Sequence, residues 1–402
     1  MVSSIKILKT VYGGDGMGRL GDGRVVFVPG TFAGEQVKAE IIAEKKNFVK
    51  ARLIEIEESS PNRTGNGEVP VPGAVFWNLS YKGECGEKAL QLQDFFDRAR
   101  ITIPCAVKTL PSAPVDDSSM LNYRNKVVYR FVMRGKTPVM GYLKEPSHEI
   151  VDMPSDTLAC PEINASLPEI RESVFRLLTT GPVSVRKHIE RKETVTVRYA
   201  ARSGIAWWIG DAPNDVILKE STCGRRFDVP ADGFYQINGK VGEALVKSVV
   251  SRFNLAPTAE VVDLYCGVGV FGICMSPQKL VGIESGRRAV EFAKINAKAN
   301  SIESASFFSG QAAKELHRFS ASADTTIVVD PPRGGLERKV ADTLACSLSP
   351  RIFYVSCDPA TLMRDLRILS HTYEVEDVEW FNMFPRTARF ETLVVLRKKK
   401  SK

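Results

Sequence analysis

Hydrophobic and polar residues alternate in short runs over the first part of the chain. These runs are separated by glycine-rich turns and lie at residues 5–9, 23–29, 35–42 and 48–56. Alternation with a period of two is typical of strands that bury one face. Roughly four or five short strands in so short a stretch predict a small β-barrel, which we expect to form a domain at residues 1–60.

The next part of the chain, residues 61–230, mixes two periodicities. Runs with helical spacing lie at 88–98 and 161–178, and alternating runs lie at 123–133, 138–143, 194–200 and 205–210. This mixture predicts a central α+β domain. Its basic residues include Arg124, Lys126, Arg130 and Arg134. Their side chains either face a nucleic acid or lie on an ordinary solvated surface.

From residue 231 onward strands and helices alternate. The strand-like runs, most of them joined by helical segments, lie at 260–265, 280–284, 304–308, 326–330, 351–356, 374–380 and 391–397. This order predicts an α/β domain at residues 231–402, a doubly wound Rossmann-like parallel sheet that ends in an antiparallel pair.

Composition and charge narrow the class of protein. The chain has 402 residues, of which 44% are hydrophobic and 25% are charged, values typical of a globular protein with several domains. It has no apolar run of about 18 residues and no leader-like start, so we expect a cytoplasmic protein that does not enter a membrane. The net charge of +8 favours a polyanionic partner such as nucleic acid.

Cysteine and histidine are placed in a way that disfavours a metal centre. None of the eight cysteines forms a Cys-x-x-Cys pair, and the four histidines are far apart in the chain. Zinc and iron–sulfur sites need ligands at close, regular spacings. We therefore expect no bound metal, and reduced thiols.

A glycine-rich turn follows the strand-like run that begins at residue 260. Gly267 and Gly269 let the backbone bend sharply and approach a ligand. Glu284 ends the next strand, where a carboxylate can bind ribose hydroxyls. The turn lacks the third glycine of a dinucleotide fingerprint and has Asp263 before the bend, which favours S-adenosylmethionine over NAD. Gln236, just upstream, is either a second ligand contact or a helix-entry residue.

Three further residues come at strand ends or starts. Asp330 ends a buried strand and is followed by two prolines and Arg333. Cys357 lies between a strand and a helix that begins near Pro359, where unpaired N–H groups favour a thiolate. Because ligands bind at the carboxyl edge of open α/β sheets, we expect both residues at one site. Glu391 begins the last strand.

A cysteine, a carboxylate base and a sulfonium donor together suit one reaction. Carbon 5 of uracil is a poor nucleophile, but a thiolate that adds to carbon 6 produces an enolate whose carbon 5 can take a methyl group. A base must then remove the proton from carbon 5, and the thiolate leaves.

The motifs quoted above resemble the RNA uridine-5-methyltransferase family of the RumA and TrmA type over nearly the whole chain. The N-terminal segment resembles its TRAM domain, an RNA-binding barrel of the oligonucleotide-binding type, in Tyr12-Gly-Gly-Asp-Gly-Met-Gly-Arg19. The resemblance implies that Cys357 is the nucleophile and Glu391 the proton acceptor. It also implies five S-adenosylmethionine contacts, Gln236, Tyr265, Glu284, Asp330 and, more weakly, Gln311.

Some residues depart from the family pattern. Many relatives bind an iron–sulfur cluster, but residues 71–77 contain no cysteine here, and Cys160 matches a fourth ligand without companions, so we expect no cluster. Asn382 replaces a usual Asp, and Arg389 replaces a usual His. These changes affect how the base is positioned, and they leave the reaction type as it is.

The resemblance leaves the RNA target open. By analogy alone, the TRAM-like barrel favours 23S rRNA over tRNA as the substrate. We also expect the enzyme to be a monomer. Methylation of cytosine is disfavoured because the motif at Asp330 lacks the second cysteine of cytosine-directed enzymes. A non-catalytic RNA-binding or assembly factor on a methyltransferase fold is the remaining alternative, and the presence of Cys357 and Glu391 argues against it.

Overall fold

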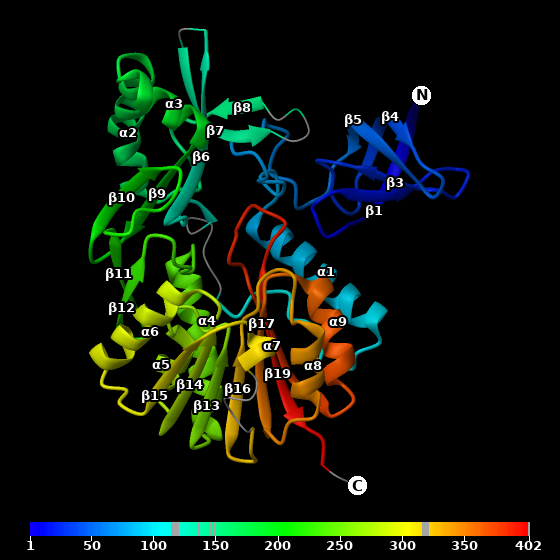
Figure 1. Ribbon diagram of the computed structural model, residues 1–402. Helices are drawn as coiled ribbons and strands as arrows, with labels where there is room; N and C mark the ends of the chain where they lie inside the picture. The colour runs from blue at the N-terminus through cyan, green and yellow to red at the C-terminus, as the bar shows by residue number, and fades with distance from the viewer. Residues whose placement is uncertain (114–119, 136, 145–146, 148, 316–320, 401–402) are drawn as a thin grey trace.

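The computed structural model describes residues 1–113, 120–135, 137–144, 147, 149–315 and 321–400. The chain forms a small barrel, a central α+β domain and a large α/β domain (Figure 1). The barrel and the central domain both lie beyond the carboxyl ends of the parallel strands of the large sheet. Residues from all three parts therefore meet at the edge of the sheet where ligands bind in open α/β folds.

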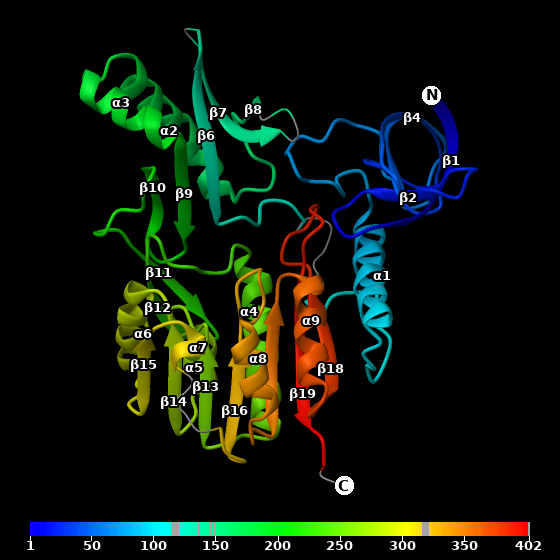
Figure 2. The same cartoon turned by 45° about the vertical axis from the view of Figure 1, so that its right-hand side comes forward.

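The barrel is closed, as its alternating pattern predicts. Its strands are β1 (Val2–Thr10), β2 (Gly16–Arg19), β3 (Val25–Val28), β4 (Gln36–Glu44) and β5 (Phe48–Glu58), and they pair in the order β1-β2-β3-β5-β4. Inward positions such as Ile5, Val26 and Val49 are buried and form the barrel core. The turn between β1 and β2 points toward the rest of the molecule (Figure 2).

The central domain combines a five-stranded antiparallel sheet with two helices. The strands are β6 (Lys126–Arg134), β7 (Thr137–Lys144), β8 (Glu149–Asp152), β9 (Thr194–Ala200) and β10 (Gly204–Ile209), in the order β10-β9-β6-β7-β8. Helices α2 (Pro161–Thr179) and α3 (Val183–Lys192) cover one face of this sheet. A hairpin of β11 (Ile217–Thr222) and β12 (Arg225–Pro230) leads into the large domain.

The large domain has a mostly parallel sheet in the order β15-β14-β13-β16-β17-β19-β18. Its strands are β13 (Glu260–Leu264), β14 (Lys279–Glu284), β15 (Ala305–Ser309), β16 (Thr325–Val329), β17 (Arg351–Ser356), β18 (Tyr373–Phe381) and β19 (Glu391–Lys398). The strand order reverses at β13, where β14 and β16 pair on opposite sides. The doubly wound fold with a final antiparallel pair is therefore confirmed.

Helices cover both faces of this sheet. They are α4 (Gly239–Leu255), α5 (Val270–Met275), α6 (Arg287–Ala299), α7 (Ala312–Glu315), α8 (Arg338–Ala345) and α9 (Pro359–Leu369). Helices α4, α5 and α6 share one buried core with the sheet, and α8 and α9 share the other. Helix α1 (Tyr81–Ala99), from the segment expected to be central, joins that second core through Leu92 and Phe96.

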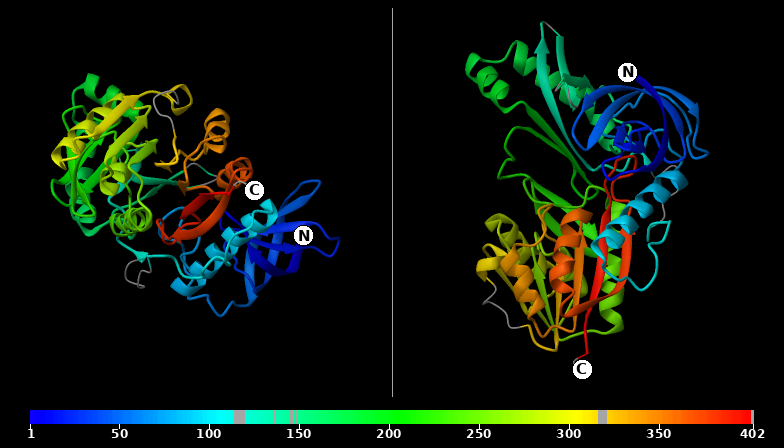
Figure 3. Two further views of the ribbon diagram at one scale, coloured as in Figure 1. Left: turned by 90° about the horizontal axis from the view of Figure 1, so that it is seen from below. Right: turned by 90° about the vertical axis from the view of Figure 1, so that its right-hand side faces the viewer.

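A loop at residues 382–390 links β18 to β19 and rises toward the barrel and the central domain (Figure 2 and Figure 3). Because this loop lies near one end of α1, the start of β19 lies below the barrel and the central domain. Across the described residues, no helix is both long and apolar enough to span a bilayer.

Candidate active site

The glycine-rich turn at the carboxyl end of β13 is held by a carboxylate from β14. Tyr265, Gly267 and Gly269 have positive φ values of 62°, 54° and 89°. The Gly267 N–H donates to Glu284 Oε2 at 3.2 Å, and Gly286 N–H donates to Glu284 Oε1 at 2.8 Å. Glu284 thus braces the turn, and a ligand that bound it would share these oxygens with the backbone.

Asp263 is a fully buried carboxyl group beneath the same turn. Its Oδ2 accepts a hydrogen bond from Gly272 N–H at 2.9 Å, while its Oδ1 has no partner among the described residues. Burial raises the pKa of Asp263 to about 7, and the charge of Glu284 adds to the rise. An orphaned buried oxygen favours a ligand that brings a donor or a positive charge.

A cavity of about 610 Å³ opens between this turn and the central domain. Gln236, Tyr265 and Asp330 line it, whereas Glu284 and Gln311 do not. Gln311 is instead exposed at the start of α7. Three of the five expected cofactor contacts therefore meet at one cavity.

The segment before α4 forms another wall of the cavity. Gln236 packs against Gly242, where an added Cβ would come within 2.6 Å of Gln236 Cβ. Asn238 caps α4 through its Oδ1, and its Nδ2 has no partner among the described residues. Phe234 at the rim is 67% exposed. Because Asn238 lines the cavity, its unpaired donor is one of the groups open to a ligand.

Cys357 and Glu391 lie side by side on neighbouring strands. Ser356 pairs with Thr392 in the antiparallel β17/β19 ladder, so the residues that follow and precede that pair face the same edge. Cys357 is half-buried, and Glu391 is 5% exposed. Asp330 lies close enough to raise the pKa of both groups. The structure thus brings the expected nucleophile and base together next to a residue of the cavity.

The electrostatics of this edge differ from the sequence expectation of a thiolate. Burial, together with the charges of Glu391, Asp330 and Asp358, raises the pKa of Cys357 to about 11, and Arg333 opposes this rise. The first N–H groups of α9, at Ala360 and Thr361, are bonded to Asp358 Oδ1 at 3.0 and 3.2 Å. The helix N-terminus is therefore capped by a side chain, and the free protein holds Cys357 as a thiol.

Glu391 is held in its protonated form by its surroundings. Burial raises its pKa well above the usual range, and the neighbouring Asp330 adds to the rise. The pKa of Asp330 itself is raised to about 7 by burial and by Asp263. A positive charge brought in by a ligand would lower all three carboxyl pKa values at once.

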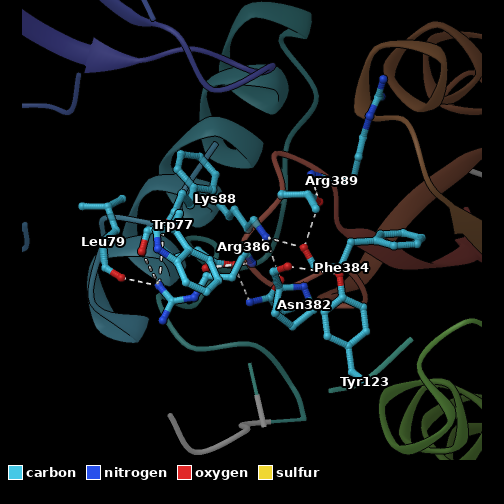
Figure 4. Close-up of polar contacts among 12 residues, drawn as sticks. Trp77, Leu79, Lys88, Tyr123, Asn382, Phe384, Arg386 and Arg389 are labelled. Atoms are coloured by element: carbon cyan, nitrogen blue, oxygen red, sulfur yellow. Dashed lines mark hydrogen bonds and ion pairs between the residues drawn. The ribbon is translucent and has the colours of Figure 1, made fainter. Parts of the chain in front are cut away.

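A buried polar network holds the loop that leads to Glu391 (Figure 4). Lys88 donates to Glu84 Oε1 and to Asn382 Oδ1, both at 2.7 Å, and Asn382 Nδ2 donates to Glu84 Oε1 at 2.9 Å. The Arg386 N–H donates to both Glu84 oxygens. Glu84 and Lys88 are completely buried. The amide of Asn382 accepts from a cation and donates to an anion, which a carboxylate in its place could not do.

Sequence reasoning did not find this network. Glu84 and Lys88 are spaced four apart on α1 and flank the buried residues Cys85 and Ala89. An oppositely charged pair at that spacing within an apolar helix face was the available signal. Arg386 adds a second anchor, because its Nη1 donates to the backbone oxygens of Trp77 and Leu79 at 3.3 and 2.5 Å (Figure 4).

Basic residues on the barrel divide into two groups. Lys6, Lys9, Lys38 and Arg52 pair with Glu58, Asp94, Glu55 and Glu40, respectively. Among the described residues, Lys45, Lys46 and Lys50 form no ion pair and are exposed. Lys45, Lys46 and Lys50 therefore offer charge that no ion pair among the described residues neutralises, whereas the first group does not.

In the central domain, the basic residues expected near RNA are partly engaged. Arg124 lies over the rings of Tyr123 and Tyr142, each 5.9 Å from its guanidinium carbon. Arg130 pairs with Glu193 at 3.2 Å, and Arg134 donates to a backbone oxygen. Arg124 therefore serves the packing of this domain.

Cys160 lies in the apolar core of the central domain. It packs in the same buried cluster as Val71 and Ala74, from the segment where relatives carry cluster ligands. Within the described ranges, no group of three or more His, Cys, Asp or Glu side chains could hold a metal ion.

Comparisons with known proteins agree with this geometry. The family model for tRNA (Uracil-5-)-methyltransferase matches residues 218–399, and the TRAM domain model matches residues 2–54. Relatives include uncharacterized RNA methyltransferases of Thermosynechococcus vestitus (28% identical, 95% of each chain) and Halalkalibacterium halodurans (28% identical, 99% of this chain and 97% of the relative).

One solved structure is similar over almost the entire length. It is the Pyrococcus abyssi tRNA (uracil-54, C5)-methyltransferase in complex with S-adenosyl-L-homocysteine. The identity is 20%, the TM-score is 0.73, and the match covers 98% of this chain and 100% of the other. At this identity the likeness establishes the shared fold, barrel included.

Proposed function

Because this chain belongs to the RNA uridine-5-methyltransferase family of the RumA and TrmA type, with its N-terminal TRAM domain, we propose that it methylates carbon 5 of a uridine in 23S rRNA through a covalent bond to Cys357. Its activity as an RNA methyltransferase follows from the family. The observation that carries the proposed mechanism is the pairing of Cys357 with Glu391 beside Asp330 and the cavity.

The cavity suits S-adenosylmethionine as the methyl donor, which would bring a sulfonium and an ammonium charge together with ribose hydroxyls. Asp330 lines the cavity and Asp263 is buried beneath the turn beside it, and both are carboxyl groups whose pKa values of about 7 a cation would lower. Asn238 offers a free amide donor, and Gln236 lines the wall. We propose Gln236, Tyr265 and Asp330 as direct contacts, and Glu284 as a contact that also braces the turn.

The residues of this chain then act in a fixed order. The half-buried Cys357 gives up its proton to solvent, and its thiolate bonds to carbon 6 of the uracil, which converts the carbon 4 carbonyl to an enolate and makes carbon 5 nucleophilic. After carbon 5 takes the methyl group, Glu391 removes the carbon 5 proton, the double bond re-forms, and the bond between Sγ and carbon 6 breaks. Burial of Glu391 keeps water away from this step.

Glu391 must be ionised when it takes that proton. In the free protein its surroundings favour the protonated form. A bound cationic donor beside Asp330 would lower the pKa of both carboxyl groups, so Glu391 would lose its proton before methyl transfer and be ready to take the carbon 5 proton afterwards. The same charge favours the thiolate of Cys357, and the site thereby reacts with uridine chiefly in the loaded state.

The barrel supplies an RNA-contacting face on β3 and β5. Phe27 and Phe48 are partly exposed, with ring centroids 5.8 Å apart. Phe27 pairs in register with Lys50, and Lys45 and Lys46 precede β5. Aromatic rings stack on unpaired bases while lysines follow the phosphate backbone. We expect Phe27→Ala and Lys50→Ala to weaken RNA binding, and Lys38→Ala, whose lysine is paired with Glu55, to serve as the matched control.

Two classes of RNA, 23S rRNA and tRNA, are candidates for the substrate. The barrel was the reason to favour 23S rRNA, yet the Pyrococcus abyssi enzyme that matches 98% of this chain carries tRNA in its name. A barrel therefore accompanies both substrate classes, and tRNA uridine is the second candidate. Mass mapping of 5-methyluridine in 23S rRNA and tRNA from a strain that lacks this gene decides between them.

The reaction is tested with RNA labelled with tritium at carbon 5 of uridine. Wild-type protein with S-adenosylmethionine is expected to release tritium, and Cys357→Ala is expected to release none. Glu391→Gln is expected to accumulate the methylated adduct, visible as a protein–RNA band that survives denaturation. If wild type binds RNA but neither releases tritium nor forms an adduct with 5-fluorouridine RNA, the chain is a binding factor and the proposed mechanism is wrong.

A further inference from the structure

The barrel reaches the reactive edge of the large sheet through one side chain. Tyr12 lies in the turn between β1 and β2, and its hydroxyl accepts a hydrogen bond from Arg389 Nη1 at 2.7 Å. The same Nη1 lies 3.4 Å from Asp358 Oδ2. Asp358 follows Cys357 in the chain, and Arg389 lies two residues before Glu391. One guanidinium thus joins the barrel to the segments that carry both proposed catalytic residues.

Asp358 has two separate tasks. Its Oδ1 caps α9 through the N–H groups of Ala360 and Thr361, and its Oδ2 faces Arg389. Its backbone is tied to Ser356, whose Oγ accepts from Asp358 N–H at 3.2 Å and donates to Asp358 O at 3.0 Å. Cys357 lies between these two residues, so contacts that hold Asp358 also restrain the backbone of Cys357.

The ring of Tyr12 is wedged among aromatic residues of the large domain. It packs edge to face with Phe95 of α1 and with Phe390, at centroid distances of 5.6 and 5.9 Å. The Arg389 guanidinium carbon lies 5.2 Å from the Tyr12 ring. Burial raises the pKa of Tyr12 to about 12, so its hydroxyl stays neutral and can accept from the guanidinium. The barrel therefore holds Arg389 by both a hydrogen bond and a cation–π contact.

We propose that Arg389, held by Tyr12 of the barrel, is a positioning residue that orients Asp358 and offsets its charge beside Cys357, so that docking of the barrel and reactivity of the thiol are coupled. This inference rests on the proposed role of Cys357. Through this coupling the barrel also influences the reactivity of the thiol, because a displaced barrel would no longer hold Arg389 through Tyr12.

The charges that face Cys357 come from every element packed around it. Glu391 on β19, Asp330 after β16 and Asp358 before α9 are acidic, while Arg333 and Arg389 are basic. Tyr12 is the barrel's titratable group at this site. Without the Arg389 cation the acidic groups dominate, and the thiolate of Cys357 becomes less stable.

The test is the pH dependence of Cys357 alkylation in the full-length protein. Iodoacetamide is added without RNA or cofactor, and the Cys357 peptide is quantified by mass spectrometry. Arg389→Gln is expected to shift the midpoint upward by about one pH unit, because it removes a cation. Asp358→Asn is expected to shift it downward, because asparagine keeps the helix cap and loses the negative charge. The double variant is expected to return near wild type.

Two further variants separate positioning from charge. Tyr12→Phe keeps the ring packing and the cation but loses the acceptor, and we expect a smaller upward shift than for Arg389→Gln. Arg338→Gln removes an exposed arginine that pairs with Asp342 on α8, and no shift is expected. An Arg389→Gln alkylation curve identical to that of wild type would overturn the inference. Shifts of the same sign for Arg389→Gln and Asp358→Asn would also overturn it, because a general loosening of the structure moves both midpoints in one direction.

Adduct formation with 5-fluorouridine RNA distinguishes this inference from the proposed function. If wild type forms the adduct, Arg389→Gln is expected to form it about tenfold more slowly at neutral pH and at the wild-type rate at high pH. If wild type forms no adduct while the alkylation curves move as described, the proposed function fails and the coupling of Arg389 to the thiol stands.

Discussion

The two halves of the candidate site are built in different ways. The half around Asp263 is assembled from one stretch of chain, where Gly267 and Gly272 N–H groups are bound by Glu284 and Asp263. The half around Cys357 and Glu391 depends on distant segments, because α1, the barrel and the central domain all hold the loop before Glu391. The turn beside the proposed donor cavity is thus braced within residues 263–284, although Gln236 and Asp330 complete the cavity, whereas the loop to the proposed base is held by three other parts of the molecule.

This difference predicts which functions a substitution in each half will affect. A change in the turn is expected to affect the affinity for the cofactor and little else. A change in α1 or the barrel is expected to alter chemistry at a site that it does not touch. The three predictions below test this contrast, beginning with the largest expected effect.

The first prediction concerns the buried pair on α1. Lys88→Met leaves Glu84 buried without its cation, which typically costs about 3–5 kcal/mol of unfolding free energy. We expect a large fall in thermal stability and, in the folded fraction, loss of tritium release, because the loop to Glu391 is freed. Lys247→Met is the matched control, since Lys247 and Glu243 form an exposed pair with the same spacing. Equal stability of the two variants would contradict the role given to the network.

The second prediction concerns pH and the two carboxyl groups near the cavity. Asp263 and Asp330 have pKa values raised to about 7, so both lose protons as pH rises through neutrality. A cation binds the ionised forms, and affinity for S-adenosylmethionine is expected to rise about tenfold between pH 6 and pH 8. S-adenosylhomocysteine lacks the sulfonium charge and is the control, for which a shallower dependence is expected by titration calorimetry. Identical slopes for the two ligands would remove the carboxyl groups from sulfonium recognition.

The third prediction concerns the glycine turn. Gly269 has a φ of 89°, and a Cβ there would come within 2.9 Å of Ile273 Cδ1. Gly269→Ala is expected to cost about 1–2 kcal/mol, seen as weaker cofactor binding, with the alkylation curve of Cys357 unchanged. Gly21→Ala is the control, because Gly21 has open space around it and no positive φ. A shifted Cys357 curve in Gly269→Ala would show that the two halves are not independent.

Local pattern was enough to predict the fold and which strand ends meet at the cavity edge. The barrel strands, the order of strands and helices after residue 260, and the meeting of Asp330 with Cys357 all follow from periodicity and from the geometry of parallel sheets. Gln236 and Tyr265 also line the cavity as expected. These features depend on residues close in sequence or on rules that hold for every doubly wound sheet.

Long-range packing explains what the sequence could not predict. The Glu84–Lys88 pair is bound by Asn382 and Arg386, almost 300 residues away. The thiol is less acidic than its helix position predicts because burial and the neighbouring carboxyl groups of Glu391 and Asp330 raise its pKa. The β11/β12 hairpin was missed for a different reason, since its inward positions include Glu220, which breaks the alternation of apolar residues.

The placement of β19 has a consequence for how the protein is made. This strand lies between β17 and β18, so the middle of that sheet edge is filled by a segment that leaves the ribosome after both of its neighbours. The barrel, in contrast, uses residues synthesised much earlier than β19, and each of its strands pairs within that stretch. A nascent chain can thus complete its barrel long before Glu391 is synthesised, and the place between β17 and β18 is filled only after translation has passed residue 398.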